Sequence, residues 1–552
     1  MSANRGPRAV VSRPACATLG RWLADGAEPR SDAETLRTAL ADLNRPVVLV
    51  ETASGPAVAN GGSVSLAPGE RGHPVLAILP PLSPATLGDP SFCSDHGLRF
   101  PYVTGAMANG IASAEVVEAV AAAGMLAFFG AAGLSLERIE SALVRLKANL
   151  ADRKYGFNLI HSPNEQNLES ATVDLFLRHA LRLVEASAYL DLTPHIVRYR
   201  LSGIHLGPNG EVVTPNRVIA KVSRVEVASK FFAPPPERFV RDLVTQNVLT
   251  AEQAELAKRV PVAQDLTVEA DSGGHTDNRP AVTLLPTMLA LRDRLQAQYA
   301  YTDPLRVGQG GGIATPASAA AAFAMGAAYV LTGSVNQACV ESGSSDIVRQ
   351  MLAEAGQADV AMAPAADMFE MGVKVQVLKR GTMFPMRAAK LYELYRSYSS
   401  LDVIPEAERT TLEKNVFRFP IDEVWRQTRE FFLRRDPPQV PKAEADAKHK
   451  MALVFRWYLG QSSRWANAGV PDRKLDYQVW CGPSMGAFNE WVKGSYLENP
   501  KNRMVVAVAL NLLYGAAITL RRGQLRAQGV NLDELLPHRP QERQELERRL
   551  GE

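Results

Sequence analysis

Cysteine is scarce in this sequence, and the few cysteines lie far apart. The chain has four, Cys16, Cys93, Cys339 and Cys481, with no CxxC pair and no Cys/His cluster. A disulfide framework and a zinc site therefore have no basis in the sequence. We expect a protein without a metal centre, located in a reducing cytoplasm.

The sequence also lacks an excess of charge and a long apolar run. Sixty-one Lys and Arg against fifty-eight Asp and Glu leave a formal charge of +3, too little to indicate a nucleic-acid partner or a membrane surface. The N-terminus has no apolar segment typical of a signal peptide, and no uncharged stretch is long enough to span a bilayer. The most apolar segment, 504–518, contains Asn511 and is predicted to be a buried helix.

What is present is a globular chain, 46% hydrophobic, that changes character along its length. Residues 1–19 are expected to be disordered, and 20–99 to form a small α+β lead-in. A barrel is predicted over 100–335, followed by a helical C-terminal region, 336–538, packed against the barrel mouth. Residues 539–552 are predicted to be a charged tail.

Between residues 100 and 335, short apolar runs alternate with amphipathic segments of helical period, as in βαβ units. The predicted strands are 100–105, 126–130, 155–160, 183–188, 218–222, 265–269, 305–308 and 328–331. The predicted helices are 114–123, 136–150, 168–181, 193–201, 236–259, 283–297 and 316–326. Right-handed crossovers make closure economical, so the fold class is predicted to be α/β, a TIM (β/α)₈ barrel, with an open doubly wound sheet as the rival.

The strongest chemical signal is the segment VGQGGGIATP, residues 307–316. Gly310, Gly311 and Gly312 allow a close backbone approach to a ligand. Thr315 is a predicted N-cap with Pro316 at the first helical position, so a helix N-terminus faces the glycines. A Rossmann fingerprint would need a further glycine at position 313, which is isoleucine; this disfavours the open sheet.

A second small-residue loop follows the last predicted strand and contains Gly333 and Ser334. The loops after the seventh and eighth strands form the phosphate site of many TIM barrels. The two loops together predict a phosphate site. The alternative is a pair of tight turns that hold no ligand.

A third loop, 269–277, reads EADSGGHTD and follows the sixth predicted strand, so it falls at the catalytic face of a barrel. Gly274 is a candidate cofactor contact. His275 is a candidate proton donor or electrostatic anchor, with Asp271 or Asp277 available to orient it. The alternative is a histidine on a solvated loop.

Earlier strand ends supply weaker candidates. Residues 107–109 (Met107, Ala108 and Asn109) offer small groups and an amide suited to lie under a flat ring. Asn158 and Lys221 lie near the ends of two further strands, and a lysine near a flavin can stabilise negative charge on the ring. Glu185 and Ser187 are weaker still. For each of these residues a structural role remains open.

Two later segments are less specific. Residues 374–396 carry six basic residues against one acid, which could hold a phosphorylated partner or form a solvated helix face. Residues 477–491 are rich in aromatic side chains, a composition more typical of a core than of a cofactor site.

The motifs together resemble the superfamily of nitronate monooxygenases and FMN-dependent enoyl reductases. Within it they are most similar to the PfaD-like trans-acting enoyl reductases of polyunsaturated fatty acid and trans-acyltransferase polyketide synthases. The resemblance covers nearly all of the chain after about residue 46. It is carried by PYVTGAMANGIAS, YGFNLIHSP, EADSGGHTDNRP, VGQGGGIATPASAAAAFAMGAAYVLTGSVNQ, KVQVLKRGTMFPMRAAKLYELYRSY, KHKMALVFRWYLGQSSRWANAG and WCGPSMGAFNEW.

This resemblance implies an FMN-binding barrel in which NADPH reduces the flavin, and the flavin passes hydride to an enoyl thioester on an acyl carrier protein. Its partners would be polyketide or fatty acid synthase subunits, and a homodimer stays open. The phosphate would be held by Gly311, Gly312, Gly333 and Ser334. The ring would be lined by Met107, Ala108, Asn109, Asn158 and Lys221.

The resemblance makes His275 the catalytic or substrate-orienting residue. Superfamily members often read Ala-Gly-Gly-His, whereas Asp271 and Ser272 precede the glycines here. His275 could therefore donate a hydrogen bond to an enolate rather than supply the proton. Two other functions stay open: oxygen-dependent oxidation of a nitronate-like acid, and a non-catalytic docking subunit of a megasynthase.

Overall fold

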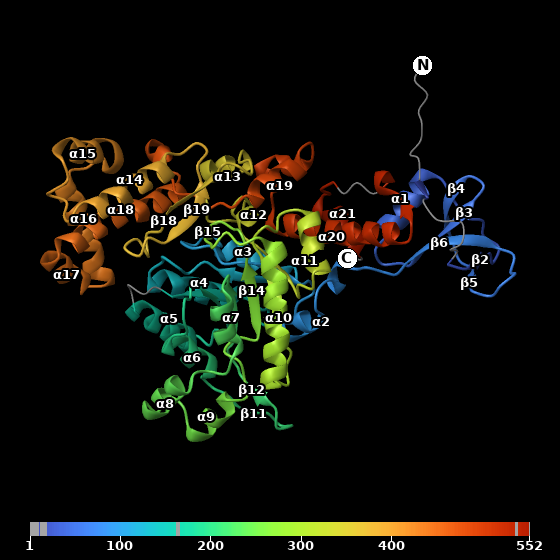
Figure 1. Cartoon of the computed structure of the whole chain (residues 1–552), viewed down its shortest axis with the longest axis horizontal. Helices are drawn as coiled ribbons and strands as arrows, with labels where there is room; N and C mark the ends of the chain where they lie inside the picture. The colour runs from blue at the N-terminus through green and yellow to red at the C-terminus, as the bar shows by residue number, and fades with distance from the viewer. Residues whose placement is uncertain (1–9, 12–18, 162–165, 536–538, 551–552) are drawn as a thin grey trace, which may run out of the picture.

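The structure is a computed structural model that describes residues 10–11, 19–161, 166–535 and 539–550. Most of the N-terminal segment predicted to be disordered, 1–19, lies outside the described residues. Figure 1 shows a barrel with a small sheet on one side and a group of helices on the other.

Eight parallel strands close into a barrel at the centre of the molecule. The last strand pairs with the first through Val330 and Tyr102, so no open edge remains. This confirms the predicted TIM barrel and rules out the open sheet. The strands are β7 (Tyr102–Thr104), β8 (Leu126–Phe129), β9 (Gly156–Ile160), β10 (Leu183–Ser187), β13 (Arg217–Val222), β14 (Asp265–Glu269), β16 (Arg306–Gly310) and β17 (Val330–Thr332).

Helices surround the barrel and mostly match the predicted ones. The exception follows β13, where the predicted helix 236–259 is two helices and an unpredicted helix precedes them. Thr250 and Gln253 form a capping box that starts the second of the two. The helices are α3 (Ala114–Ala122), α4 (Leu136–Leu150), α5 (Gln166–Arg178), α6 (Pro194–Leu201), α7 (Val225–Phe232), α8 (Glu237–Thr245), α9 (Ala251–Ala257), α10 (Ala281–Tyr299) and α11 (Pro316–Ala324).

A buried charge cluster closes the N-terminal end of the barrel. Arg306 donates from Nε to Asp265 Oδ1 at 2.6 Å, and His96, at the end of α2 (Pro90–His96), lies 2.8 Å from Asp265 Oδ2. Burial raises the pKa of Asp265, but the charges of His96 and Arg306 outweigh burial and hold it below its ordinary value. Asp265 and Arg306 begin their strands, so this cluster is at the opposite end from a ligand site at the strand C-termini.

The N-terminal part is an antiparallel sheet of five strands in the order β4-β3-β6-β2-β5. Arg521, on the long C-terminal helix α20 (Val505–Ala527), donates hydrogen bonds to four carbonyl groups of this part, those of Leu40, Asp42, Arg45 and Pro80. The sheet is thereby joined to α20. Its elements are β2 (Arg21–Leu23), α1 (Ala33–Ala41), β3 (Val47–Thr52), β4 (Gly55–Ala59), β5 (Ser63–Ser65) and β6 (His73–Leu79).

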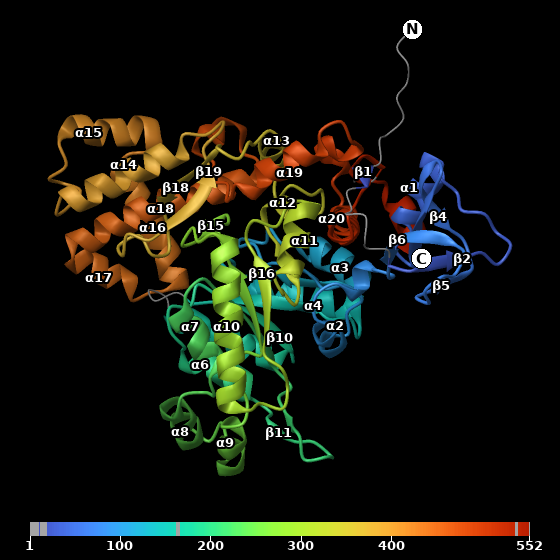
Figure 2. The same cartoon turned by 45° about the vertical axis from the view of Figure 1, so that its right-hand side comes forward.

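Helix α20 runs between the barrel and the N-terminal sheet, packing on α11, α3 and β6 (Figure 2). It is long and apolar enough to cross a membrane, but 83% of its apolar window is buried inside the protein. Asn511 on this helix is fully buried and donates to the carbonyl of Gln541. The predicted buried helix is confirmed.

The C-terminal region contains strands as well as helices, which the sequence analysis did not predict. Strands β18 (Val360–Pro364) and β19 (Lys374–Leu378) form a small sheet with β15 (Gly274–His275) from the barrel loop. The segment predicted to be a charged tail contains a helix, α21, whose Leu546 is fully buried. The other helices are α12 (Ser334–Gln337), α13 (Asp346–Ala353), α14 (Phe384–Ser397), α15 (Glu406–Thr411), α16 (Ile421–Arg435), α17 (Gln439–Ala445), α18 (Ala447–Ala468), α19 (Ser484–Val492) and α21 (Arg543–Leu550).

Candidate active site

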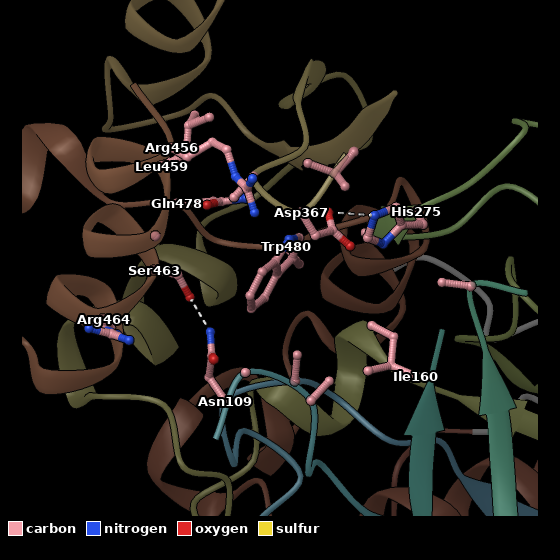
Figure 3. A pocket seen from close by; sticks show the side chains of 18 of the residues that line it. Asn109, Ile160, His275, Asp367, Arg456, Leu459, Ser463, Arg464, Gln478 and Trp480 are labelled. Carbon is pink, nitrogen blue, oxygen red and sulfur yellow. Dashed lines mark hydrogen bonds and ion pairs between the residues drawn. The ribbon is translucent and has the colours of Figure 1, made fainter. Parts of the chain in front are cut away.

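Two adjoining cavities lie where the C-terminal ends of the barrel strands meet the C-terminal helices. The larger has a volume of about 580 Å³ and runs from the strand ends to α16 and α18 (Figure 3). The smaller, about 80 Å³, lies against the glycine loops. Both are lined by Ala106, Met107, Lys221, Glu269 and Trp480, so they adjoin one another.

The two predicted phosphate loops meet at the smaller cavity, which is lined by Gly310, Gly311 and Gly312 from one and by Gly333 and Ser334 from the other. A Cβ added at Gly312 or Gly333 would meet no heavy atom within 4 Å. These two positions therefore border open space of the kind that a bound group would fill. A Cβ at Gly311 would lie 2.6 Å from the carbonyl oxygen of Ala270, so Gly311 is required by the fold itself.

The local structure of both loops leaves donors at this cavity. Thr315 caps α11 through a capping box with Ser318, and Pro316 occupies the first turn, as predicted. The hydroxyl oxygen of Ser334 accepts a hydrogen bond from the Gly482 N–H at 3.1 Å. The Ser334 O–H remains available as a donor to an anion.

The residues predicted to line a flat ring all border the larger cavity: Met107, Ala108, Asn109, Asn158 and Lys221. The Asn158 side-chain oxygen accepts from the N–H groups of Ala131 and Ala132, at 2.7 and 3.2 Å. Its NH₂ group is thus the part that can donate a hydrogen bond to a ligand. Asn109 has φ +59° and donates to Ser463 Oγ at 2.8 Å, which ties the first barrel loop to α18.

Lys221 lies between two carboxylates, with its Nζ 3.5 Å from Glu269 Oε1 and 3.9 Å from Glu185 Oε2. Burial lowers the pKa of Lys221, but the two carboxylates outweigh burial and raise it, so the side chain is a cation. Glu185 is fully buried, and burial raises its pKa. Its Oε2 accepts from the Ala106 N–H, whereas its Oε1 has no partner among the described residues.

His275 is oriented by a residue that sequence reasoning missed. Its Nε2 lies 3.2 Å from Asp367 Oδ1, and the side chain is about one-third exposed, at 34% (Figure 3). Burial lowers the pKa of His275, but the nearby Asp367 carboxylate outweighs burial and raises it. A protonated imidazole is therefore favoured at this position.

The predicted partners of His275, Asp271 and Asp277, are wrong. Asp271 accepts hydrogen bonds from Asn278 and Gln376, and Asp277 pairs with Arg224 at 2.9 Å. The physical reason is the pairing of β15 with β19, which turns His275 toward the C-terminal region. Asp367 precedes β19 in the chain and lies 92 residues after His275, so no local pattern connects the two.

The loop 480–483 lies at the site through Trp480, although the composition of residues 477–491 had indicated a core segment. Trp480 lines both cavities. A Cβ at Gly482 would lie 2.8 Å from the Gly273 nitrogen, and a Cβ at Gly273 would lie 2.9 Å from the Cys481 nitrogen. Two glycine-bearing backbones therefore touch here, which explains the need for small residues in the Gly-Gly-His loop. In the sequence, the Cys-Gly-Pro motif at 481–483 was the signal that could have indicated this close backbone contact.

Half of the basic residues in the stretch 374–396 form ion pairs within the chain. Arg387 pairs with the buried Asp476, Arg380 with Asp359, and Lys390 with Glu393 and Glu408. These ion pairs favour a structural role for three of the six basic residues.

The observed residues fit a cofactor with a phosphate at one end and a planar ring at the other. The space beside Gly312 and Gly333 adjoins the Ser334 hydroxyl, and the larger cavity adds the Asn158 amide and the Lys221 cation. Among the described residues, no group of three or more His, Cys, Asp or Glu side chains is arranged to hold a metal ion.

Comparison with family profiles gives two matches along the chain. Residues 93–395 match the profile described as nitronate monooxygenase, which is more than half of the sequence. Residues 398–477 match the profile described as the inserted helical domain of [acyl-carrier-protein] S-malonyltransferase.

Individual relatives are similar over most of the chain. It is 47% identical to one of the polyunsaturated fatty acid synthase subunits of Thraustochytrium sp., over 94% of this chain and 34% of the relative. It is 45% identical to the polyketide biosynthesis protein PksE of Bacillus subtilis, over 79% of this chain and 56% of the relative. The chain thus spans between about a third and about a half of these relatives.

A solved structure is also similar, the enoyl reductase domain of MlnA from the macrolactin biosynthesis cluster of Bacillus amyloliquefaciens. The TM-score is 0.76 at 41% sequence identity, with 80% of this chain and 99% of that domain covered. The similarity therefore extends over nearly the whole of that domain.

Proposed function

Since this chain belongs to the nitronate monooxygenase family, we propose that it is an FMN- and NADPH-dependent enoyl reductase. It would act in trans on enoyl thioesters carried by an acyl carrier protein. The observation that carries this proposal is the pair of adjoining cavities: the two glycine loops line the smaller one, Asn158 and His275 line the larger one, and Lys221 lines both.

In this proposal the phosphate of FMN is held by Gly310, Gly311, Gly312, Gly333 and Ser334. The backbone N–H groups of such loops and the N-terminus of α11 favour a dianion. When bound, the flavin would supply hydride transfer from NADPH to the enoyl thioester. Everything else in the reaction falls to the chain's own side chains.

Met107, Ala108, Asn109, Asn158 and Gly274, which all line the larger cavity, would hold the ring. Lys221 would stabilise negative charge on the ring, because the two carboxylates beside it keep it protonated. Asn158 donates from its NH₂ group, since its oxygen is already occupied by two backbone N–H groups.

His275 is the catalytic residue of the proposal. Asp367 stabilises the protonated form of His275, which would donate a hydrogen bond to the thioester carbonyl oxygen as that oxygen gains negative charge. The same N–H can pass its proton to the substrate and be reprotonated from solvent.

The partners in this proposal are subunits of a polyketide or polyunsaturated fatty acid synthase that present the carrier-bound substrate. The names of the relatives support this, as does the match of residues 398–477 to a domain of a transferase that uses an acyl carrier protein. A cytoplasmic location and a homodimer are further parts of the proposal.

The matched family profile supports a second candidate, oxygen-dependent oxidation of a nitronate-like acid. The two candidates share the flavin and differ in the electron acceptor. Flavin reduced under nitrogen and then reoxidised by an enoyl thioester on a carrier protein supports the reductase. Reoxidation by oxygen coupled to loss of a nitronate, with no response to the thioester, supports the oxidase.

The test of the proposal is uptake of FMN by purified protein, followed by turnover of NADPH with the carrier-bound substrate. We expect a yellow protein whose flavin band bleaches with NADPH. A protein that takes up no FMN on reconstitution contradicts the proposal. A protein that binds FMN but shows no turnover with any acceptor supports a docking subunit instead.

A further inference from the structure

The α16 and α18 side of the larger cavity is lined by arginines that the proposed chemistry does not use. Arg435 at the end of α16 and Arg464 on α18 both line the cavity. Their guanidinium carbons lie 5.7 and 5.1 Å from the centre of the Phe431 ring. Two helices therefore bring two like charges onto one aromatic ring.

The charge of Arg464 is not balanced by a carboxylate. Among the described residues Arg464 has no ion pair. Glu430, the carboxylate of α16 that lines this cavity, pairs with Arg426 instead. Arg464 is exposed to solvent on one side. Partial desolvation on the cavity side, and then the like charges of Arg435 and of Arg138 on α4, lower its pKa. An anion placed between these groups would relieve their mutual repulsion.

The position of the arginines suits the far end of a long ligand. In Figure 3, Arg464 and the His275–Asp367 pair lie on opposite sides of Trp480. A ligand whose reacting end is at His275 would therefore extend past Trp480 toward Arg464. A guanidinium offers a planar fork of donors that matches a phosphate group.

We propose that Arg464, with Arg435 beside it, binds a phosphate ester of a ligand that reacts in this cavity. The inference rests on the proposed function, and it names a residue that helps to determine which ligands the cavity binds. Two ligands carry this chemistry: the phosphopantetheine arm of the acyl carrier and the phosphates of the nicotinamide dinucleotide.

Direct binding to the variant Arg464→Gln tests the proposal. Calorimetry with 4′-phosphopantetheine, pantetheine, NADPH and NADH would be run on the flavin-loaded and the flavin-free protein. The control is Arg429→Gln, which removes the same charge from α16 but lies outside the cavity lining and pairs with Glu444. We expect Arg464→Gln to weaken at least one phosphate-bearing ligand about tenfold or more, and pantetheine hardly at all.

The source of the phosphate follows from which ligand is affected. A loss for 4′-phosphopantetheine alone identifies the acyl arm, and a loss for the dinucleotides alone identifies the hydride donor. Unchanged affinity for every phosphate-bearing ligand, or an equal loss in the Arg429→Gln control, overturns the inference. Binding of 4′-phosphopantetheine is also measured on the flavin-free protein. A failure of FMN uptake, which contradicts the proposed function, can therefore be distinguished from a failure of this inference.

Discussion

At the scale of single residues, the glycines around the smaller cavity have different structural roles. Gly311 is needed because the Ala270 carbonyl leaves no room for a side chain, whereas Gly312 and Gly333 border open space. Only the second kind of glycine reports on a ligand. The sequence predicted all of them as one phosphate site, because a run of glycines does not distinguish a tight turn from a cradle.

The first prediction uses this difference. A Gly333→Ala substitution adds a methyl group where no protein atom lies within 4 Å. We expect the unfolding free energy of the flavin-free protein to change by less than about 1 kcal/mol. The FMN dissociation constant should rise about tenfold or more, because the methyl group occupies the phosphate space. Urea denaturation and flavin fluorescence titration measure the two quantities. Loss of stability without loss of FMN affinity would contradict the account.

The second prediction concerns the charge of His275. Burial lowers the pKa of His275 and the Asp367 carboxylate raises it, with smaller opposing effects of Glu269 and Lys221. Asp367→Asn removes the main raising influence, so the pKa of His275 should fall. The fall in kcat/KM on the alkaline side should then move to lower pH, since His275 loses its proton earlier. The His275–Asp367 pair also stabilises the folded protein. This contribution is fully present below the pKa of the histidine in the unfolded chain and is lost as pH rises through its pKa in the folded protein. Asp367→Asn should remove it.

The matched control for this experiment is Asp277→Asn. Asp277 was a predicted partner of His275 from sequence, but it pairs with Arg224. Its pH profile of kcat/KM should stay at the wild-type position. If the alkaline side of the kcat/KM profile shifts in Asp277→Asn and not in Asp367→Asn, then Asp277 orients His275, as the sequence had suggested.

At the scale of elements, the barrel was predictable and its attachments were not. Each barrel strand is a short apolar run followed by a helical period, so local pattern suffices for all eight. Strands β18 and β19 were missed: β19 pairs with β15, about a hundred residues earlier in the chain, and β18 joins the sheet only through β19. Helix α7 was missed because it begins three residues after β13, without a spacer.

The third prediction tests the contact between the Gly-Gly-His loop and the loop 480–483. In Gly482→Ala the added methyl group would lie 2.8 Å from the Gly273 nitrogen, so one backbone must move. We expect kcat to fall roughly 10- to 100-fold, because His275 is displaced from its position. Steady-state kinetics measure this. In the control Gly523→Ala, on α20, the methyl group meets open space, and kcat should be unchanged. Equal kcat in both variants would count against a positioning role for this contact.

At the scale of the whole molecule, α20 joins parts that are far apart in sequence. Its buried Arg521 donates to four carbonyl groups between residues 40 and 80, and its other faces pack on the barrel helices α3 and α11. The sequence predicted a buried helix here from an apolar run interrupted by Asn511. It could not indicate the partners, because each lies hundreds of residues away.

The fourth prediction is that Arg521→Met loosens the N-terminal sheet. Four carbonyl groups would lose a charged donor, so the unfolding free energy should fall by about 3 kcal/mol or more. Limited proteolysis should then cut first within residues 20–99. The control Arg526→Met removes an exposed ion pair with Asp533 and should cost less than about 1 kcal/mol. Equal losses in the two variants would show that Arg521 does not join the parts.

We propose, above all, that two glycine loops at one end of the barrel bind the phosphate of a flavin mononucleotide. The most direct measurement compares the dissociation constants of FMN and riboflavin, which carries the same ring without the phosphate, on the flavin-free protein. The account predicts that FMN binds about a hundredfold more tightly or better, equivalent to roughly 2.8 kcal/mol. Equal affinity for the two ligands would contradict it.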